Sequence, residues 1–198
     1  MELAAKFSLM YGKEVKMSRI GKKVITIPAG VTCTFENGLL TVKGPKGELT
    51  QTVDSCINAN IEGNELSFVV AKETSDSNAK HGLYRALANN MVIGVSQGFK
   101  KTLLVSGVGY KVNVSGNKLN LNLGLSHPVE IEIPASLKVA CPSVTQIDVE
   151  GINKQEVGQF ASKLKDLRPV EPYHGYGLRY SDEVVIRKVG KTAGKGKK

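Results

Sequence analysis

The stretch Phe35-Glu-Asn-Gly-Leu-Leu-Thr-Val42 decides the fold, because the similar stretch Val114-Ser-Gly-Asn-Lys-Leu-Asn-Leu121 follows at a spacing of roughly 80 residues. In each copy, asparagine and glycine form a turn. Apolar and polar residues alternate in the segment before this turn, in the segment after it, or in both. This pattern is typical of a β-hairpin, since Asn and Gly readily adopt the left-handed conformations of a tight turn. The two copies therefore indicate a tandem duplication.

Short strands and one helix are expected to complete the first copy. Gly44-Pro-Lys-Gly47 has the glycines and the proline of a second turn. A helix is predicted from Ala79 to about Asn90, because Leu83, Ala86 and Leu87 fall on one face. The strands predicted beside the hairpin span residues 49–53, 57–61 and 66–70.

The second copy repeats this order and ends in a better-defined helix. Asn153 is placed to cap it, with Glu156 three residues on as in a capping box. Apolar residues then follow helical spacing as far as Leu167, and Pro169 ends the helix. The strands predicted before it span residues 110–114, 118–123, 129–133, 137–140 and 146–149.

The predicted fold class is α+β, with two tandem, structurally similar domains, each a mainly antiparallel sheet packed against one helix. Gly94-Val-Ser-Gln-Gly98 is the expected boundary between them. The expected division is a poorly ordered extension (1–16), a first domain (17–97), a second domain with a candidate RNA-binding loop (98–185) and a basic tail (186–198).

Charge points to a polyanionic partner. The chain of 198 residues carries a net charge of +9, and the segment from Arg168 to Lys198 holds eight cations against three acids. A tail so poor in apolar residues does not fold alone, so it is either disordered or ordered by an anionic partner. Its cations, with no acid among them, are Arg187, Lys188, Lys191, Lys195, Lys197 and Lys198.

Cysteine spacing and hydropathy exclude other classes of protein. Cys33, Cys56 and Cys141 are odd in number and far apart, which favours buried thiols in a reducing compartment over disulfides or a zinc site. No apolar run approaches the roughly 20 residues that span a bilayer, so no membrane insertion is expected.

Catalytic signatures are incomplete. Gly190-Lys191-Thr192 resembles the end of a phosphate-binding loop, but Val185 stands where that loop needs glycine. Gly107-Val-Gly109 begins a dinucleotide fingerprint whose third glycine is replaced by Val112. The three histidines lie in separate segments with no obvious nucleophile. We therefore expect no catalytic residues, metal ligands or cofactor.

The segment from Tyr173 to Tyr180 is the main candidate for binding RNA. Gly175 and Gly177 remove side chains, so that backbone N–H groups can approach phosphate oxygens. Tyrosine rings can stack on unpaired bases and a guanidinium group can bind phosphate with two hydrogen bonds. The alternative is a turn whose tyrosines close the core of the second domain. The candidate residues are Tyr173, His174, Gly175, Tyr176, Gly177, Arg179 and Tyr180, flanked by Arg168.

A second basic segment lies near the start of the first domain. Lys16, Arg19, Lys22 and Lys23 form a short arm there. Arg19 and Lys22 are candidates for phosphate contact, and a solvated terminus is the alternative for the whole arm.

From Met17 onward the chain closely resembles the bacterial form of the ribosomal protein L-six family. The matching stretches follow one another in the family's order over nearly the whole chain, which makes the match more specific than any single motif. They are Met17-Ser-Arg-Ile-Gly-Lys-Lys23, Ile27-Pro-Ala-Gly-Val31, Val42-Lys-Gly-Pro-Lys-Gly47, Gly107-Val-Gly-Tyr110, Leu123-Gly-Leu-Ser-His-Pro-Val129, and Glu171-Pro-Tyr173 through Arg179-Tyr180.

The resemblance implies a structural, non-catalytic protein of the large subunit of cytoplasmic ribosomes that binds 23S rRNA, mostly through its second domain. It also implies a place near the stalk base and the sarcin–ricin region, beside neighbouring ribosomal proteins and where translational GTPases dock. The family's signature usually reads Tyr-Lys-Gly-Lys-Gly, whereas this chain has Tyr173-His-Gly-Tyr-Gly177. Stacking by Tyr176 and a hydrogen bond from His174 would then replace two lysines.

Two other classes of function stay open on the residues alone. A protein-interaction adaptor would recruit a partner chain through exposed sheet edges. An enzyme acting on nucleotides is the third hypothesis, which the incomplete motifs disfavour.

Overall fold

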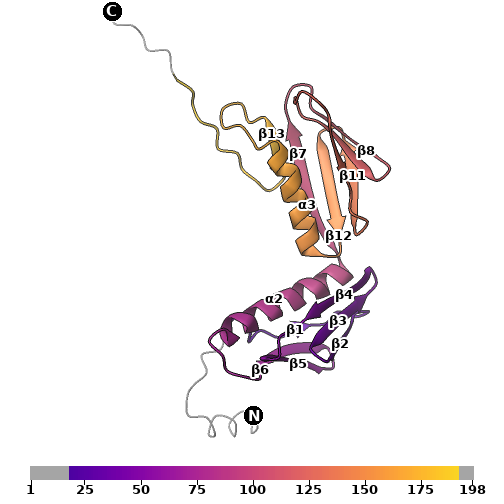
Figure 1. Cartoon of the computed structure of the whole chain (residues 1–198), viewed down its shortest axis with the longest axis vertical. Coiled ribbons are helices and arrows are strands. Elements are labelled where there is room, and N and C mark those ends of the chain that lie inside the picture. The colour runs from indigo at the N-terminus through magenta and orange to yellow at the C-terminus, as the bar shows by residue number, and fades with distance from the viewer. Residues whose placement is uncertain (1–17, 192–198) are drawn as a thin grey trace, which may run out of the picture. The chain divides into compact units, whose positions relative to one another are not determined.

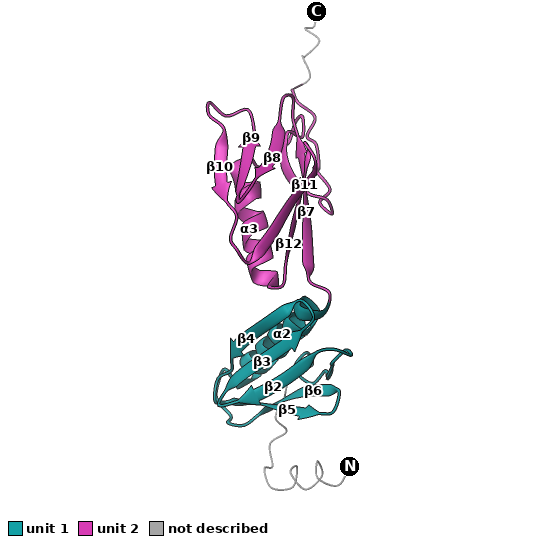
Figure 2. Cartoon of the chain, turned by 90° about the vertical axis from the view of Figure 1, so that its right-hand side faces the viewer, with its two compact units in different colours: residues 1–96 teal, residues 97–198 magenta. Residues whose placement is uncertain are grey.

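The computed structural model describes residues 18–191. The extension 1–16 and the tail residues Lys195, Lys197 and Lys198 lie outside the described residues. The chain divides into two compact units, residues 1–96 and residues 97–198 (Figure 2).

Between residues 18 and 96, the first unit forms two small antiparallel sheets and one helix, α2 (Ser77–Ser96), which packs against strands of both sheets (Figure 1). One sheet has the order β2-β3-β4 and the other the order β1-β6-β5. The strands are β1 (Ile25–Thr26), β2 (Thr32–Glu36), β3 (Leu39–Gly44), β4 (Gly47–Thr52), β5 (Ile57–Glu62) and β6 (Glu65–Val70).

The predicted Asn-Gly hairpin is confirmed between β2 and β3. Asn37 and Gly38 both have positive φ, 51° and 75°, and Glu36 pairs with Leu39 across the turn. On β3, Leu40 and Val42 are buried while Leu39 and Lys43 face outward. The alternation of the sequence thus directs every second side chain of β3 into the core.

The second unit has the same parts and one strand more. Its described residues form the sheet β10-β9-β8, the sheet β11-β12-β7-β13 and the helix α3 (Lys154–Leu167). This helix packs against β7, β12 and β13. The strands are β7 (Phe99–Ser106), β8 (Lys111–Ser115), β9 (Lys118–Asn122), β10 (Val129–Glu132), β11 (Leu137–Ser143), β12 (Gln146–Gly151) and β13 (Gly177–Tyr180).

Sheet topology confirms the duplication. The order β1-β6-β5 in the first unit corresponds to β7-β12-β11 in the second, and β2-β3-β4 corresponds to β8-β9-β10. A single helix follows the sixth strand in each. The α+β class and the tandem arrangement are therefore confirmed, and the structure adds that the strands of each unit divide into two sheets. Only β13 has no counterpart among the described residues of the first unit.

The helix α3 is confirmed with its predicted cap. Asn153 Oδ1 accepts a hydrogen bond from the backbone N–H of Gln155 at 3.0 Å, and the Asn153 amide donates to the Glu156 carboxylate at 2.9 Å. This satisfies one of the N–H groups that a helix leaves unpaired at its start. Along the helix, the side chains buried in the core belong to Val157, Phe160, Ala161 and Leu164.

Three features differ from the sequence prediction. Helix α2 begins at Ser77 and continues to Ser96, past Gly94, which was expected in the boundary. The strands β1 and β7 were not predicted. Residues 177–180 form the edge strand β13 and not part of a loop, with Leu178 paired to Val105 of β7.

The cysteines are unpaired, as the spacing predicted, but only Cys56 is buried. Cys33 and Cys141 are half-buried, and partial burial raises the pKa of both thiols. Within residues 18–191, neither helix combines the length and the apolar character needed to cross a membrane.

Candidate nucleic-acid interface

The candidate binding loop, residues 168–176, joins α3 to β13 and is closed by backbone hydrogen bonds. Leu178 N–H donates to the carbonyl of Arg168 at 2.9 Å, and Glu171 N–H donates to the carbonyl of Tyr176 at 2.8 Å. The Gly175 N–H donates to the carbonyl of Glu171 at 3.0 Å. The Gly175 amide is thus engaged within the loop, contrary to the expectation that it points at a phosphate.

Gly177 is needed where the loop returns to the end of the helix. Its φ is +138°, and a Cβ atom at this position would lie 2.6 Å from the carbonyl oxygen of Pro169 and 2.8 Å from that of Arg168. Real Cβ atoms do not approach backbone so closely, so any side chain here would force the two segments apart. The glycine thus permits the close approach that fixes the shape of the loop.

Two of the three tyrosines present their rings to solvent. Tyr173 is 52% exposed and Tyr176 is 38% exposed. The imidazole of His174 stacks on the ring of Tyr176, with centroids 5.5 Å apart and planes inclined by 14°. Its Nδ1 atom lies 3.2 Å from the Glu171 carboxylate. The pair His174–Tyr176 therefore offers a preformed stacking surface on the loop.

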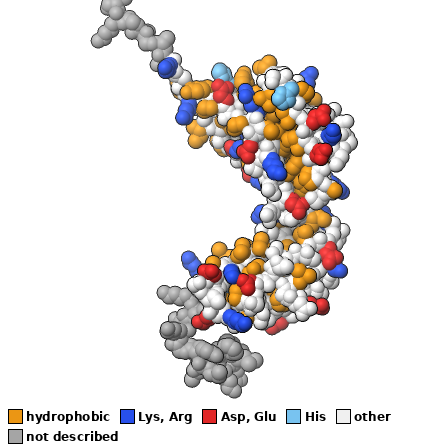
Figure 3. All heavy atoms as spheres, viewed as in Figure 1, with side chains coloured by type: hydrophobic (Ala, Val, Ile, Leu, Met, Phe, Trp, Pro, Cys, Tyr) orange, Lys and Arg blue, Asp and Glu red, His pale blue; other side chains and the backbone are white. Residues whose placement is uncertain are grey.

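The beginning of the basic tail runs beside this loop. Lys188 N–H donates to the carbonyl of Pro172 at 2.8 Å, and the guanidinium group of Arg187 packs over Gly175. The structure thus brings Arg187 and Lys188 next to the exposed aromatic rings. Figure 3 shows Lys and Arg side chains near hydrophobic ones at the end of the described chain, where Lys191 is exposed.

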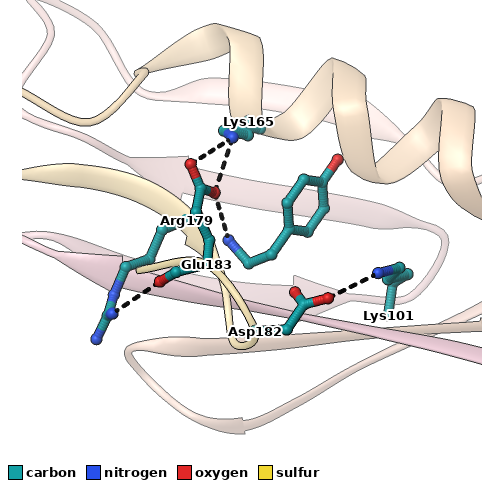
Figure 4. A network of polar contacts seen from close by, with 6 residues as sticks. Lys101, Lys165, Arg179, Asp182 and Glu183 are labelled. Carbon is teal, nitrogen blue, oxygen red and sulfur yellow. Dashed lines mark hydrogen bonds and ion pairs between the residues drawn. The ribbon is translucent and has the colours of Figure 1, made fainter. Parts of the chain in front are cut away.

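A network of ion pairs fixes the turn after β13 (Figure 4). Lys165 of α3 contacts the Glu183 carboxylate at 2.7 Å, and Glu183 also accepts a hydrogen bond from the Tyr180 N–H at 3.2 Å. Lys101 of β7 contacts Asp182 at 3.3 Å. The hydrogen bond from Lys165 holds the pKa of Glu183 below its ordinary value. The exit of the tail from the second unit is therefore fixed by side chains of two other elements.

Tyr180 lies inside this network. Its half-buried ring packs against the core, with the Nζ atoms of Lys165 and Lys101 at 4.9 Å and 5.2 Å from its centroid. For Tyr180 the structure favours the alternative in which a tyrosine closes the core. Lys101 and Lys165 are likewise engaged by acids and are poor candidates for RNA contact.

Arg179 is half-buried and in Figure 4 points away from Lys165. Its Nη1 atom lies 3.4 Å from the carbonyl oxygen of Glu183, a long hydrogen bond that a phosphate group can displace. The remaining N–H donors of the guanidinium group can bind a phosphate.

Arg19 and Lys22 belong to the first unit, in the arm that precedes β1. Both side chains are exposed. The arm is held by Gly21, which packs directly on the buried ring of His81, and by the Lys23 carbonyl, which accepts from Arg85. His81 therefore has a structural role in the first unit.

Sequence reasoning missed Tyr110 as a partner of the loop. Its hydroxyl accepts a hydrogen bond from Nε of Arg168 at 3.2 Å. The available signal is the turn Gly107-Val-Gly-Tyr110, which on sequence indicates only an incomplete dinucleotide fingerprint and the family resemblance. Nothing in that turn reveals a contact with a residue 58 positions away.

Comparison with known proteins gives a consistent result. The sequence profile of the family described as "Ribosomal protein L6" matches the chain twice, at residues 27–98 and 106–181. A protein of Oenococcus oeni named "Large ribosomal subunit protein uL6" is 52% identical over 176 residues, covering 89% of this chain and 99% of that protein. Proteins with the same name from Latilactobacillus sakei subsp. sakei (54% identical over 178 residues, 89% and 99% covered) and Mesoplasma florum (51% over 180, 90% and 100%) are equally similar.

Proposed function

Because this chain belongs to the ribosomal protein L6 family, we propose that it is a structural constituent of the large ribosomal subunit that binds 23S rRNA through its second unit. Its close relatives carry the name of that subunit, which supports the assembly in which it works. The role we propose is to hold RNA in position, with no catalytic step of its own.

One observation carries the RNA-binding part of the proposal: the exposed rings of the loop lie beside the first cations of the tail. Tyr173, His174 and Tyr176 supply stacking surfaces, while Arg187 and Lys188 supply positive charge next to them. Unpaired bases stack on aromatic rings, and phosphates bind guanidinium and ammonium groups. A segment that combines both within one fixed loop suits an RNA bulge, loop or strand end better than a regular duplex.

The loss of two lysines that the family usually has agrees with stacking by the loop and phosphate contact by its flanks. His174 and Tyr176 stand where the family usually has lysine, and they stack on each other in place of offering two ammonium groups. Charge is instead concentrated in Arg168, Arg187, Lys188, Lys191 and the tail beyond. In this chain, we propose, the loop contributes stacking and its flanks contribute the phosphate contacts.

We further propose the location that the family resemblance implies. The chain would lie in cytoplasmic ribosomes near the stalk base and the sarcin–ricin region, in contact with neighbouring large-subunit proteins and close to the docking site of translational GTPases. A compact unit that presents stacking surfaces and positive charge from one loop can hold RNA helices in position at such a site without a conformational change.

The direct test is binding of the full chain to purified 23S rRNA over a series of KCl concentrations. We expect the logarithm of the association constant to fall linearly with the logarithm of salt, with a slope of up to about one per phosphate contacted. Co-sedimentation of the chain with large subunits from cell extracts is the second measurement. A chain that binds 23S rRNA no better than an unrelated RNA, and independently of salt, would refute the proposal.

A protein-interaction role is the second candidate, and one observation favours it. Val184, Ile186 and Val189 are 86%, 84% and 90% exposed, an unusual density of aliphatic side chains on a basic segment. Deletion of residues 190–198 keeps these three side chains and separates the two roles. If the chain acts only as an adaptor that binds a partner through them, the partner stays bound after this deletion, whereas a chain anchored to RNA by its basic tail associates more weakly with the subunit.

A further inference from the structure

The ring of Tyr110 is enclosed by two glycines from different turns. A Cβ atom on Gly107 would lie 2.5 Å from the Cδ2 and Cε2 atoms of the ring, and a Cβ atom on Gly124 would lie 2.9 Å from Cε1. Side chains at either position would collide with the ring, so the two glycines leave the space that it fills. Because the half-buried ring also packs against the core of the second unit, its orientation is fixed.

This fixed ring directs its hydroxyl group toward the end of α3. The hydroxyl oxygen accepts a hydrogen bond from Nε of Arg168 at 3.2 Å. Arg168 is the C-cap residue of α3, and its own carbonyl accepts from the Leu178 N–H, so its backbone is also held. Both ends of this exposed arginine are therefore constrained, which is unusual for a long surface side chain.

The bond through Nε leaves the outer part of the guanidinium group available. Arginine has five N–H donors, and the four on Nη1 and Nη2 have no hydrogen-bond partner among residues 18–191. Two parallel N–H donors match two oxygens of one phosphate. Arg168 is also the first residue of the loop that presents Tyr173 and Tyr176.

We propose that Tyr110 is a positioning residue for RNA binding: its hydroxyl group holds the Arg168 guanidinium in the orientation that presents Nη1 and Nη2 to a phosphate of the bound RNA. This rests on the proposed function and adds to it a residue that the charge and aromatic patterns do not indicate. The affinity for RNA increases because the arginine side chain loses less conformational freedom when it binds the phosphate. The turn 107–110 thereby becomes part of the RNA-binding apparatus without touching RNA.

The test compares affinities of full-length variants for 23S rRNA at one fixed salt concentration. Tyr110→Phe keeps the ring between its glycines and removes only the hydroxyl, so we expect an unchanged melting temperature and binding roughly three- to ten-fold weaker. Arg168→Ala should weaken binding by about ten-fold or more. The double variant should bind like Arg168→Ala alone, because the hydroxyl acts only through the arginine.

Two matched variants complete the design. Tyr84→Phe removes the hydroxyl of a half-buried tyrosine in the first unit and should leave binding unchanged. Arg168→Lys keeps the charge but lacks the Nε–H donor, so adding Tyr110→Phe to it should have no further effect.

The outcomes separate this inference from the function on which it rests. Tyr110→Phe binding like the unmodified chain, or effects that multiply in either double variant, would overturn the positioning role. If Arg168→Ala is without effect while Arg187→Glu with Lys188→Glu weakens binding, the positioning role fails and the RNA-binding function stands. If the unmodified chain shows no salt-dependent affinity for 23S rRNA, the proposed function itself fails and the inference fails with it.

Discussion

The two units share one strand order but differ in the segments that come after their helices. In the first, α2 ends at Ser96 and the chain enters β7 almost at once; in the second, α3 ends at Leu167 and a loop, an edge strand and a charged segment come next. The two units also differ in their balance of charged residues. Residues 18–96 hold eight Lys and Arg against seven Asp and Glu, whereas residues 97–191 hold thirteen against nine. Most of the proposed binding apparatus is therefore an addition to a duplicated scaffold, and only the turn 107–110 that positions Arg168 belongs to the scaffold itself.

The largest expected effect tests whether the units are independent. Leu164→Ala empties a fully buried position of α3 and should destabilise the second unit by about 2–5 kcal/mol. Calorimetry should then show one of two thermal transitions shifted. Leu66→Ala, at an equally buried position of the first unit, should shift the other. Movement of both transitions together with either substitution would show that the units unfold as one.

The next effect tests the difference in charge. Arg168→Glu combined with Arg187→Glu should weaken binding to 23S rRNA by about 100-fold and lower the salt slope by about two, because two phosphate contacts become repulsive. Arg19→Glu combined with Lys22→Glu makes the same change of charge in the first unit. We expect a much smaller loss from that pair, measured by filter binding at several KCl concentrations. Equal losses would mean that both units bind RNA directly.

A smaller effect tests the geometry of the loop. Gly177→Ala would place a methyl group against the carbonyls of Arg168 and Pro169, so we expect a loss of about 2 kcal/mol and weaker RNA binding as the loop shifts. Gly63→Ala in the first unit also has positive φ, 58°, but meets open space. It should cost about 1 kcal/mol and leave binding intact. Urea denaturation and RNA binding of the two variants measure the contrast.

The smallest effect concerns pH. The pKa of Glu183 is lowered by its hydrogen bond from Lys165, so the folded state favours the ionised carboxylate. The stabilisation is fully present above the unfolded-state pKa and disappears as pH falls through the lower folded-state value. Because the pair is partly exposed, solvent screening limits it to less than about 1 kcal/mol.

Glu183→Gln should therefore reduce the acid sensitivity of the second unit, measured as the urea midpoint between neutral and acidic pH. Glu130→Gln, which removes a longer and more exposed pair with Lys118, serves as the control. Identical pH profiles for the Glu183 variant and the unmodified chain would contradict the assignment.

Local signals were sufficient for the helix α3 and the two hairpins. Asn153, the apolar spacing from Val157 and Pro169 all lie within one segment, and each acts on its near neighbours. The Asn37-Gly38 turn is equally local, since it sets its own backbone angles. The tandem α+β arrangement follows from these elements because their order repeats.

Long-range pairing explains the elements that the sequence did not reveal. β13 exists because Leu178 meets Val105, and a four-residue segment rich in glycine and tyrosine carries no alternation that would indicate this. Gly94 suggested a boundary because glycine disfavours helices, but burial of Val92 and Val95 on either side keeps α2 intact. Residue types identified the candidate interface, whereas its geometry depends on contacts such as Arg168 with Tyr110 that are distant in sequence.

The position of β13 also affects the order of folding during synthesis. Every strand of the first unit pairs with a partner already made by the time Ser96 is added, so that unit can fold while the second is still being translated. In the second unit, Gly177 pairs with Ser106 and Tyr180 with Leu103, across about seventy residues of intervening chain. This edge of β7 therefore stays unpaired until residues 177–180 have been added. The candidate RNA-binding loop, which lies between α3 and β13, takes its shape only when that pairing forms.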